Sequence, residues 1–198
     1  MNLERLNKVN KNYRLLLLLI SLVTLLTACG NKYEGDFSFE IEDFTYTNQD
    51  GEEFSKSDLE GEFWVASMIF TNCNTVCPPM TSNMVRLQGM LADANIDAQL
   101  VSFSVDPEVD TPELLKQYAA ERGASFDNWN LLTGYTYEEI KEFVKKSFKA
   151  PLEKLEDDQY MHTTRFYIVT PEGNAIKAYD GSKAANMEKI VEDIQAMN

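Results

Sequence analysis

Two short stretches of the chain carry almost no polar side chains, and each has the length of a β-strand. Residues 63–70 are apolar except for Ser67, and residues 98–105 are uncharged and mostly apolar. Strands that are buried on both faces of a sheet have this composition. Between them, methionine and leucine side chains recur at helical spacing from residue 80 to residue 91. This pattern predicts a helix with an apolar face that joins two parallel strands by a right-handed crossover.

Alternating and helical patterns continue on either side of this unit. Residues 37–54 alternate around the turn sequence NQDG, which predicts a β-hairpin. Thr111 can cap a helix that has Pro112 at its first position and ends at Gly123. The remaining pattern predicts a short strand at 129–132, a helix at 137–148, an irregular and partly acidic segment at 149–161, two strands across the turn PEGN within 163–181, and a last helix at 184–197. This order predicts an α/β thioredoxin-like fold with an added N-terminal β-hairpin.

The N-terminal segment has the pattern of an export signal. Basic residues precede an uncharged run at 15–26, which is short for a transmembrane helix. The run ends in LTAC, and this sequence resembles a bacterial lipobox. The resemblance implies that Cys29 is diacylated and begins the mature chain at the outer face of the cytoplasmic membrane; an ordinary signal peptide with a chance cysteine is the alternative. We therefore expect a lipoprotein signal peptide at 1–28, a membrane-tether linker at 29–36 and one domain at 37–198.

The acidic charge balance restricts the class of partner. The chain has 18 basic and 32 acidic residues, of which four basic residues and one acidic residue precede Cys29. The expected mature chain therefore has 14 basic and 31 acidic residues, a net charge of −17. We do not expect such a chain to bind nucleic acid or to lie flat on an anionic membrane, because both are negatively charged. The acidic residues indicate either a solvated surface or a basic partner.

The chain has three cysteines, and two of them follow the first predicted central strand at the spacing Cys73-x3-Cys77. If Cys29 carries lipid, these two remain as a pair, and outside the cytoplasm such a pair can be oxidised. Ligands of open α/β sheets bind beyond the carboxyl ends of the strands, where this loop is expected. Pro78 and Pro79 fit the first turn of a helix, so Cys77 would lie at a helix N-terminus, which favours its thiolate. The pair is therefore a candidate disulfide or a two-sulfur metal clamp.

The spacing of the cysteines and the position of one histidine separate this chain from dithiol oxidoreductases of the same fold. Those enzymes have two residues between their cysteines and a cis-proline opposite them, whereas three residues separate Cys73 from Cys77. No proline directly precedes the strand that is predicted to begin near Thr163; the only histidine of the chain, His162, stands there. A lone histidine is more often an ordinary core or surface residue, but beside a thiol pair it is a candidate metal ligand.

Three sequence blocks together resemble the Sco family, also called SenC. They are FTNCNTVCPPMT at 70–81, VSFSVDPEVDTPELL at 101–115 and MHTTRFYIVTPEGN at 161–174. Members of this family are membrane-tethered, thioredoxin-like copper chaperones that help to assemble the copper A site of cytochrome c oxidase subunit II. The resemblance extends over nearly the whole predicted domain, whereas the acidic stretch at 152–159 matches none of its motifs.

The resemblance implies a copper site at Cys73, Cys77 and His162. Two thiolates and an imidazole suit Cu(I) and can also hold Cu(II) in a more tetragonal arrangement. A structural zinc site usually has a fourth protein ligand, and the chain has no second histidine to supply it. The family has an aspartate near the site that corresponds to Asp106, which we expect to support a copper ligand, to be an outer ligand, or to serve only the turn after its strand. The implied partners are subunit II, a copper donor or thiol reductant protein, and the membrane through the lipid.

Three classes of function remain open. The first is the copper chaperone. The second is an enzyme: either a thiol-disulfide reductase that keeps the copper A cysteines reduced, since Cys73 and Cys77 can form a reversible disulfide, or a peroxidase, which the lack of a proline before Cys73 disfavours. The third is a copper or redox sensor, which would need a partner because the sequence has no separate signalling or DNA-binding module. We interpret the sequence as a metallochaperone without catalytic residues, with the reductase as the alternative.

Overall fold

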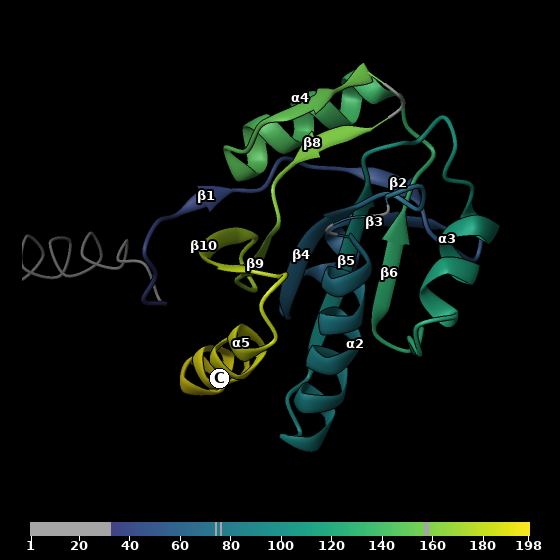
Figure 1. Ribbon diagram of the computed structural model, residues 1–198. Helices are drawn as coiled ribbons and strands as arrows, with labels where there is room; N and C mark the ends of the chain where they lie inside the picture. Colours follow the sequence, from purple (N-terminus) through teal and green to yellow (C-terminus); the bar gives the residue numbers. More distant parts are fainter. Residues whose placement is uncertain (1–32, 74, 76, 157–158) are drawn as a thin grey trace, which may run out of the picture. The chain divides into compact units, whose positions relative to one another are not determined.

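A mixed β-sheet forms the centre of the domain (Figure 1). The computed structural model describes residues 33–198 except for residues 74, 76, 157 and 158, so the predicted signal peptide and Cys29 lie outside the described residues. Residues 35–198 form one compact unit. The six strands of its sheet lie in the order β1 (Phe39–Glu40), β10 (Asn174–Asp180), β9 (Arg165–Val169), β4 (Phe63–Ile69), β5 (Ala98–Ser104) and β6 (Trp129–Leu132). β4, β5 and β6 are parallel, whereas β9 is antiparallel to β4 and β10.

Helices connect the strands and cover the sheet (Figure 1). They are η1 (Lys56–Leu59), α2 (Cys77–Asp93), α3 (Pro112–Ala120), α4 (Tyr137–Phe148) and α5 (Ala185–Met197). α2 connects β4 to β5 and packs against α5. Two small separate sheets are hairpins: β2 (Thr45–Thr47) with β3 (Glu53–Ser55), and β7 (Leu152–Lys154) with β8 (Tyr160–His162). Within the described part of the chain, none of the helices combines the length and the apolar character that a membrane span needs.

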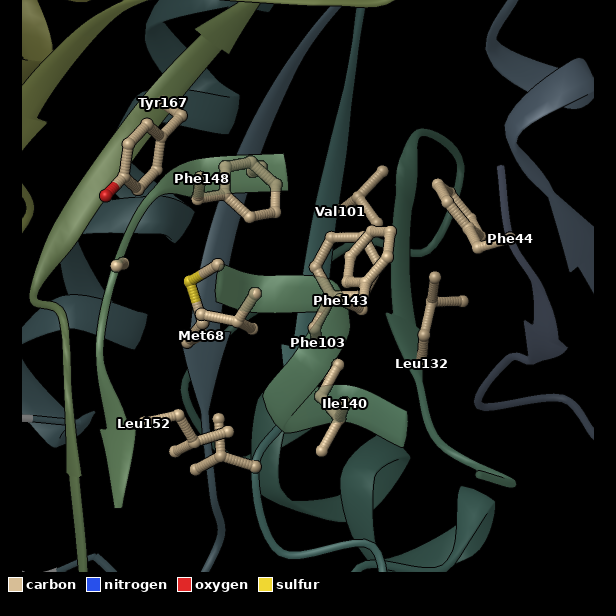
Figure 2. Packing of buried hydrophobic residues seen from close by; sticks show 14 of the residues in the cluster. Phe44, Met68, Val101, Phe103, Leu132, Ile140, Phe143, Phe148, Leu152 and Tyr167 are labelled. Atoms are coloured by element: carbon tan, nitrogen blue, oxygen red, sulfur yellow. The ribbon is translucent and has the colours of Figure 1, made fainter. Parts of the chain in front are cut away.

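The central strands are buried, and their side chains alternate between the two faces of the sheet. All seven residues of β4 are buried. Met68 of β4 lies opposite Phe103 of β5, and both belong to an apolar cluster that α4 completes with Phe143 and Phe148 (Figure 2). The ring centroids of Phe103 and Phe143 are 5.0 Å apart. This packing holds the strands firmly, so loops at their carboxyl ends have a rigid support.

The polar exception in the first central strand has partners on the neighbouring strands. Ser67 lies opposite Ser102, and their hydroxyl oxygens are 2.8 Å apart. The indole N–H of Trp129 donates to the hydroxyl oxygen of Ser102 at 3.0 Å. Because buried polar groups need hydrogen-bond partners, a shift of the parallel register by one residue would be costly. The network therefore helps to specify the pairing of β4, β5 and β6.

The structure confirms the α/β thioredoxin-like architecture with an added N-terminal hairpin, but three segments differ in detail. Residues 37–54 do not form a single hairpin, because β1 pairs with β10 along the main sheet and only β2 and β3 turn back on each other. The segment 149–161, predicted to be irregular, contains β7 and most of β8, whose three residues each are too few for a visible alternation. α3 ends at Ala120, and Gly123, with a φ of 90°, lies in the turn that follows.

Candidate metal centre

The two cysteines of the candidate site lie where β4 ends and α2 begins. The backbone N–H of Cys73 donates to the carbonyl oxygen of Phe70 at 3.3 Å, which turns the chain as it leaves the sheet. Cys77 is the first residue of α2, and the two prolines after it are tolerated because the first turn of a helix has no use for their missing N–H groups. Cys73 is 6% exposed and Cys77 0%, and both are free thiols. The loop lies beyond the carboxyl edge of the sheet and Cys77 lies at the N-terminus of a helix, as predicted.

His162 reaches Cys77 from the separate β7–β8 hairpin. It is the last residue of β8 and lies opposite Leu152 of β7. Its Nδ1–H donates to the carbonyl oxygen of Thr163 at 2.9 Å, and its Nε2 lies 3.5 Å from Sγ of Cys77. Metal-bound histidines commonly have their second ring nitrogen held by a backbone carbonyl in this way. Metal–sulfur and metal–nitrogen bonds of about 2.3 and 2.0 Å at a tetrahedral angle place their donor atoms about 3.5 Å apart, so this pair has the spacing of two ligands of one ion.

The sulfur of Cys73 lies beside Cys77 and His162. The backbone N–H of Cys77 donates to Sγ of Cys73 at 3.4 Å, and the hydroxyl of Thr75 lies 3.7 Å from the same sulfur. Over the residues that the structure describes, no group of three or more His, Cys, Asp and Glu side chains is arranged to hold a metal ion. The sulfur of Cys73 is nevertheless in hydrogen-bond contact with the side chains of His162 and Cys77, so the three predicted ligands adjoin one another.

The two thiols differ strongly in acidity. Burial raises the pKa of Cys73, but interactions with His162, with the Cys77 thiol and with the backbone outweigh it and lower this pKa to about 5. Burial raises the pKa of Cys77 far above its usual range, and the sulfur of Cys73 raises it further. At neutral pH the pair therefore retains one proton, on Cys77. The sequence predicts the thiolate at Cys77, and this prediction is wrong because burial raises the pKa of Cys77 and the N–H group at the start of α2 points at the sulfur of Cys73.

Asp106 follows β5 directly and is 2% exposed. Its Oδ1 accepts a hydrogen bond from the phenol O–H of Tyr160 at 2.9 Å. Its backbone carbonyl accepts from the N–H groups of Val109 and Asp110 at 3.1 and 2.9 Å. Burial and the hydrogen bond to Asp106 raise the pKa of Tyr160 to about 12, so the phenol keeps its proton at neutral pH. The backbone of Asp106 thus forms the turn after β5, while its carboxyl group contacts the strand that carries His162.

Asp110 has a role that the sequence pattern does not reveal. The pattern places it before the helix cap, and Thr111 does cap α3 by accepting a hydrogen bond from the N–H of Leu114 at 3.2 Å. The buried carboxyl group of Asp110 instead accepts from the N–H and the hydroxyl of Thr71 at 3.2 and 2.5 Å, and from the hydroxyl of Ser104 at 2.5 Å. Burial raises the pKa of Asp110, although these hydrogen bonds oppose the rise. The side chain ties the start of the cysteine loop to the end of β5.

Comparison with known proteins supports membership of the Sco family along the whole domain. Residues 34–198 match the model of the SCO1/SenC family. The SCO1 protein homolog of Bacillus subtilis (strain 168) is 48% identical over 173 residues, which cover 86% of this chain and 90% of that protein.

Solved structures share the fold. A SCO1/SenC family lipoprotein from Bacillus anthracis str. Ames is 45% identical, with a TM-score of 0.78 over 80% of this chain and 95% of that one. BsSco is a member of the Sco family of cytochrome c oxidase assembly proteins, and a disulfide switch was identified in it. It is 47% identical, with a TM-score of 0.77 over 84% of this chain and 98% of that chain. Yeast Sco1 with copper bound is 27% identical, with a TM-score of 0.65 over 81% and 90%. Since the family model spans the domain and close relatives align along most of the chain, this protein belongs to the SCO1/SenC family.

Proposed function

We propose that the protein is a copper metallochaperone that binds copper through Cys73, Cys77 and His162 and helps to assemble the copper A site of cytochrome c oxidase subunit II. The observation that carries the proposal is the 3.5 Å separation between Nε2 of His162 and Sγ of Cys77. Two relatives support it: BsSco belongs to a family of cytochrome c oxidase assembly proteins, and yeast Sco1 has been solved with copper bound.

The chemistry of the three side chains fits copper as a cargo. Sulfur ligands are soft and suit Cu(I), and an imidazole nitrogen suits both Cu(I) and Cu(II). The thiolate of Cys73 is available at neutral pH because its pKa is lowered to about 5. Copper binding would displace the remaining proton from Cys77, since thiolates and not thiols are strong metal ligands. A site with three protein ligands and no fourth leaves room for exchange of the ion with an acceptor.

A thiol-disulfide reductase that keeps the copper A cysteines reduced is the second candidate function. The unequal acidity of the two thiols favours it, because one cysteine is a ready nucleophile. The thiolate of Cys73 would attack a disulfide of the partner, form a mixed disulfide and release one partner thiolate. Cys77, once deprotonated, would then attack Sγ of Cys73 and release the second partner thiol, leaving a Cys73–Cys77 disulfide. The disulfide switch identified in BsSco is consistent with such a pair.

Substitution of the histidine separates the two functions. His162→Ala removes a copper donor but leaves both thiols, so we expect a reversible disulfide, a Cu(II) affinity lowered more than about 100-fold, and failure to restore cytochrome c oxidase activity in a strain that lacks the protein. The matched control is Met161→Ala, because Met161 is the preceding residue of β8 and is 47% exposed. Full rescue by His162→Ala would overturn the chaperone assignment in favour of the reductase.

We propose further that the chain is a lipoprotein at the outer face of the cytoplasmic membrane, with a signal peptide at 1–28, lipid on Cys29, a linker at 29–36 and the SCO1/SenC domain at 37–198. The relative from Bacillus anthracis, which is a lipoprotein, supports this arrangement. Such a tether would bring the site close to subunit II and to copper-donor or thiol-reductant proteins. Cys29→Ser should abolish labelling by radioactive palmitate and leave an unprocessed precursor; normal processing of this variant would exclude the lipid anchor.

A further inference from the structure

The proposed copper ligand His162 belongs to a strand, β8, that is not part of the main sheet. β8 has three residues and, within the described part of the chain, pairs with β7 in a separate two-stranded sheet. A hairpin of this size has little stability by itself, so its position depends on contacts with the rest of the domain. Any contact that fixes β8 therefore also fixes the distance from the imidazole to the cysteine sulfurs.

Tyr160 makes such a contact two residues before the histidine. Because side chains alternate along a strand, Tyr160 and His162 project from the same face of β8. Both rings pack edge-on against Phe70, with centroid separations of 5.3 Å for Tyr160 and 5.7 Å for His162. The phenol O–H of Tyr160 donates to Oδ1 of Asp106 at 2.9 Å in a buried environment. This face of β8 thus meets the ends of both central strands, β4 through Phe70 and β5 through Asp106.

Backbone hydrogen bonds hold Asp106, the acceptor of the Tyr160 hydrogen bond, in place. It directly follows the buried strand β5, and its backbone N–H donates to the hydroxyl oxygen of Ser104 at 3.1 Å. Its backbone carbonyl is held by the N–H groups of Val109 and Asp110. The carboxyl group therefore has little freedom to move, and the O–H of Tyr160 is held against the sheet.

Ion pairs on the outside of the hairpin contribute less. Lys154 of β7 lies 3.2 Å from a carboxylate oxygen of Glu108, and Lys141 of α4 lies 2.7 Å from one of Glu153. All four side chains are at least one third exposed, and exposed ion pairs typically contribute less than about 1 kcal/mol. Lys154 also contacts the ring and the hydroxyl of Tyr160, but both residues belong to the same hairpin, so this contact does not fix the hairpin to the main sheet as the bond to Asp106 does.

We infer that Tyr160 is a positioning residue for His162, which it holds at ligand distance from Cys77 through its hydrogen bond to Asp106. The inference rests on the proposed copper-binding function for its consequence, but the position of the imidazole can be measured without copper. Tyr160→Phe removes only the hydroxyl oxygen and leaves the ring that packs on Phe70. Residues that orient metal ligands typically change metal affinity about 10- to 100-fold when they are altered.

The experiment compares Tyr160→Phe with Tyr179→Phe. Tyr179 donates its phenol O–H to the carboxylate of Asp193, on α5, at 2.5 Å. The control therefore removes the same kind of tyrosine–aspartate bond, but from the contact between β10 and α5. Cu(II) is titrated into the reduced proteins under argon against a competing chelator, and its electron paramagnetic resonance spectrum is recorded. We expect Tyr160→Phe to bind Cu(II) about 10- to 100-fold more weakly and with altered copper hyperfine splitting, and Tyr179→Phe to match the unmodified protein.

A second readout uses the metal-free protein. Because His162 is the only histidine of the chain, the imidazole nitrogens give a single set of signals in nitrogen-15 spectra. We expect Nδ1–H to be the dominant tautomer in the unmodified protein and in Tyr179→Phe, and mixed or broadened signals in Tyr160→Phe. Unchanged imidazole signals together with unchanged Cu(II) affinity would overturn the inference. If His162→Ala binds Cu(II) as tightly as the unmodified protein, the proposed copper ligand is wrong, yet the metal-free spectra still decide whether Tyr160 positions the ring.

A variant that loses the fold must be distinguished from one that only releases His162. Circular dichroism of each variant at 25 °C reports whether the domain is intact. If Tyr160→Phe does not fold, Asp106→Asn replaces it, because an amide oxygen can still accept the phenol O–H while the charge is removed. We then expect an intermediate loss of Cu(II) affinity and partial broadening of the imidazole signals. An intact Asp106→Asn variant with both readouts unchanged would contradict the role assigned to the bond.

Discussion

The buried carboxyl group of Asp110 should contribute to both the stability of the domain and the reactivity of the cysteine loop. It accepts hydrogen bonds from three donor groups, the N–H and the hydroxyl of Thr71 at the start of that loop and the hydroxyl of Ser104 at the end of β5. Asp110→Ala removes the acceptor for all three donors and leaves the partly buried N–H of Thr71 without this partner. Asp110→Asn keeps the shape and one carbonyl oxygen.

The magnitude follows from the number of bonds. A buried donor left without a partner typically costs about 1–3 kcal/mol, and a hydrogen bond contributes about 1 kcal/mol net. The two hydroxyl groups can turn toward other acceptors, and removing a buried carboxyl group relieves part of its own desolvation cost, which the raised pKa of Asp110 reflects. We therefore expect Asp110→Ala to lower the free energy of unfolding by about 2–4 kcal/mol and Asp110→Asn by about 1–2 kcal/mol.

Urea unfolding, followed by the fluorescence of the buried Trp64 and Trp129, measures both effects. Asp127→Ala is the matched control, because Asp127 also accepts a serine hydroxyl hydrogen bond, at 2.6 Å from Ser125, but is exposed. It should cost less than about 0.5 kcal/mol. A second assay measures alkylation of Cys73 at pH 6, which should slow in Asp110→Ala as the loop loosens and the thiol pKa returns toward about 8.5. A loss of less than about 1 kcal/mol for Asp110→Ala, with unchanged alkylation, would refute the role assigned to this side chain.

Two further predictions concern the thiols and the centre of the sheet. Cys73, with a pKa of about 5, is ionised above that value, so its alkylation by iodoacetamide should be nearly constant from pH 6 to 8 and should fall about tenfold per unit below pH 5; peptide mapping identifies the alkylated cysteine, and a midpoint near pH 8.5 would contradict the assigned thiolate. Ser102→Ala deprives the indole N–H of Trp129 and the hydroxyl of Ser67 of their buried partner, so urea unfolding should show a loss of about 2–4 kcal/mol, whereas a loss below about 0.5 kcal/mol would mean that the network does not stabilise the sheet.

The sequence by itself determines the main elements of this fold, and its resemblance to the Sco family proposes the three side chains of the candidate site. Residues 63–70 and 98–105 are long enough and apolar enough to be read as buried strands, and the methionine and leucine spacing at 80–91 defines the helix between them. The cysteine pair is located by local rules, because a loop after a buried strand and two prolines after a cysteine fix a strand end and a helix start. These inferences depend on neighbours along the chain, which a sequence displays directly.

The tertiary structure decides the features that depend on distant parts of the chain. The bond from Thr71 to Asp110 joins residues 39 positions apart, that from Tyr160 to Asp106 joins residues 54 apart, and the contact between Cys77 and His162 spans 85 positions. No local pattern specifies such pairs, so the sequence assigns Asp110 only to a helix start and reads the segment with β7 as irregular. The acidity of the thiols is decided in the same way. It depends on burial and on the direction of the Cys77 N–H, which points at Cys73, and both exist only once the loop has folded against the sheet.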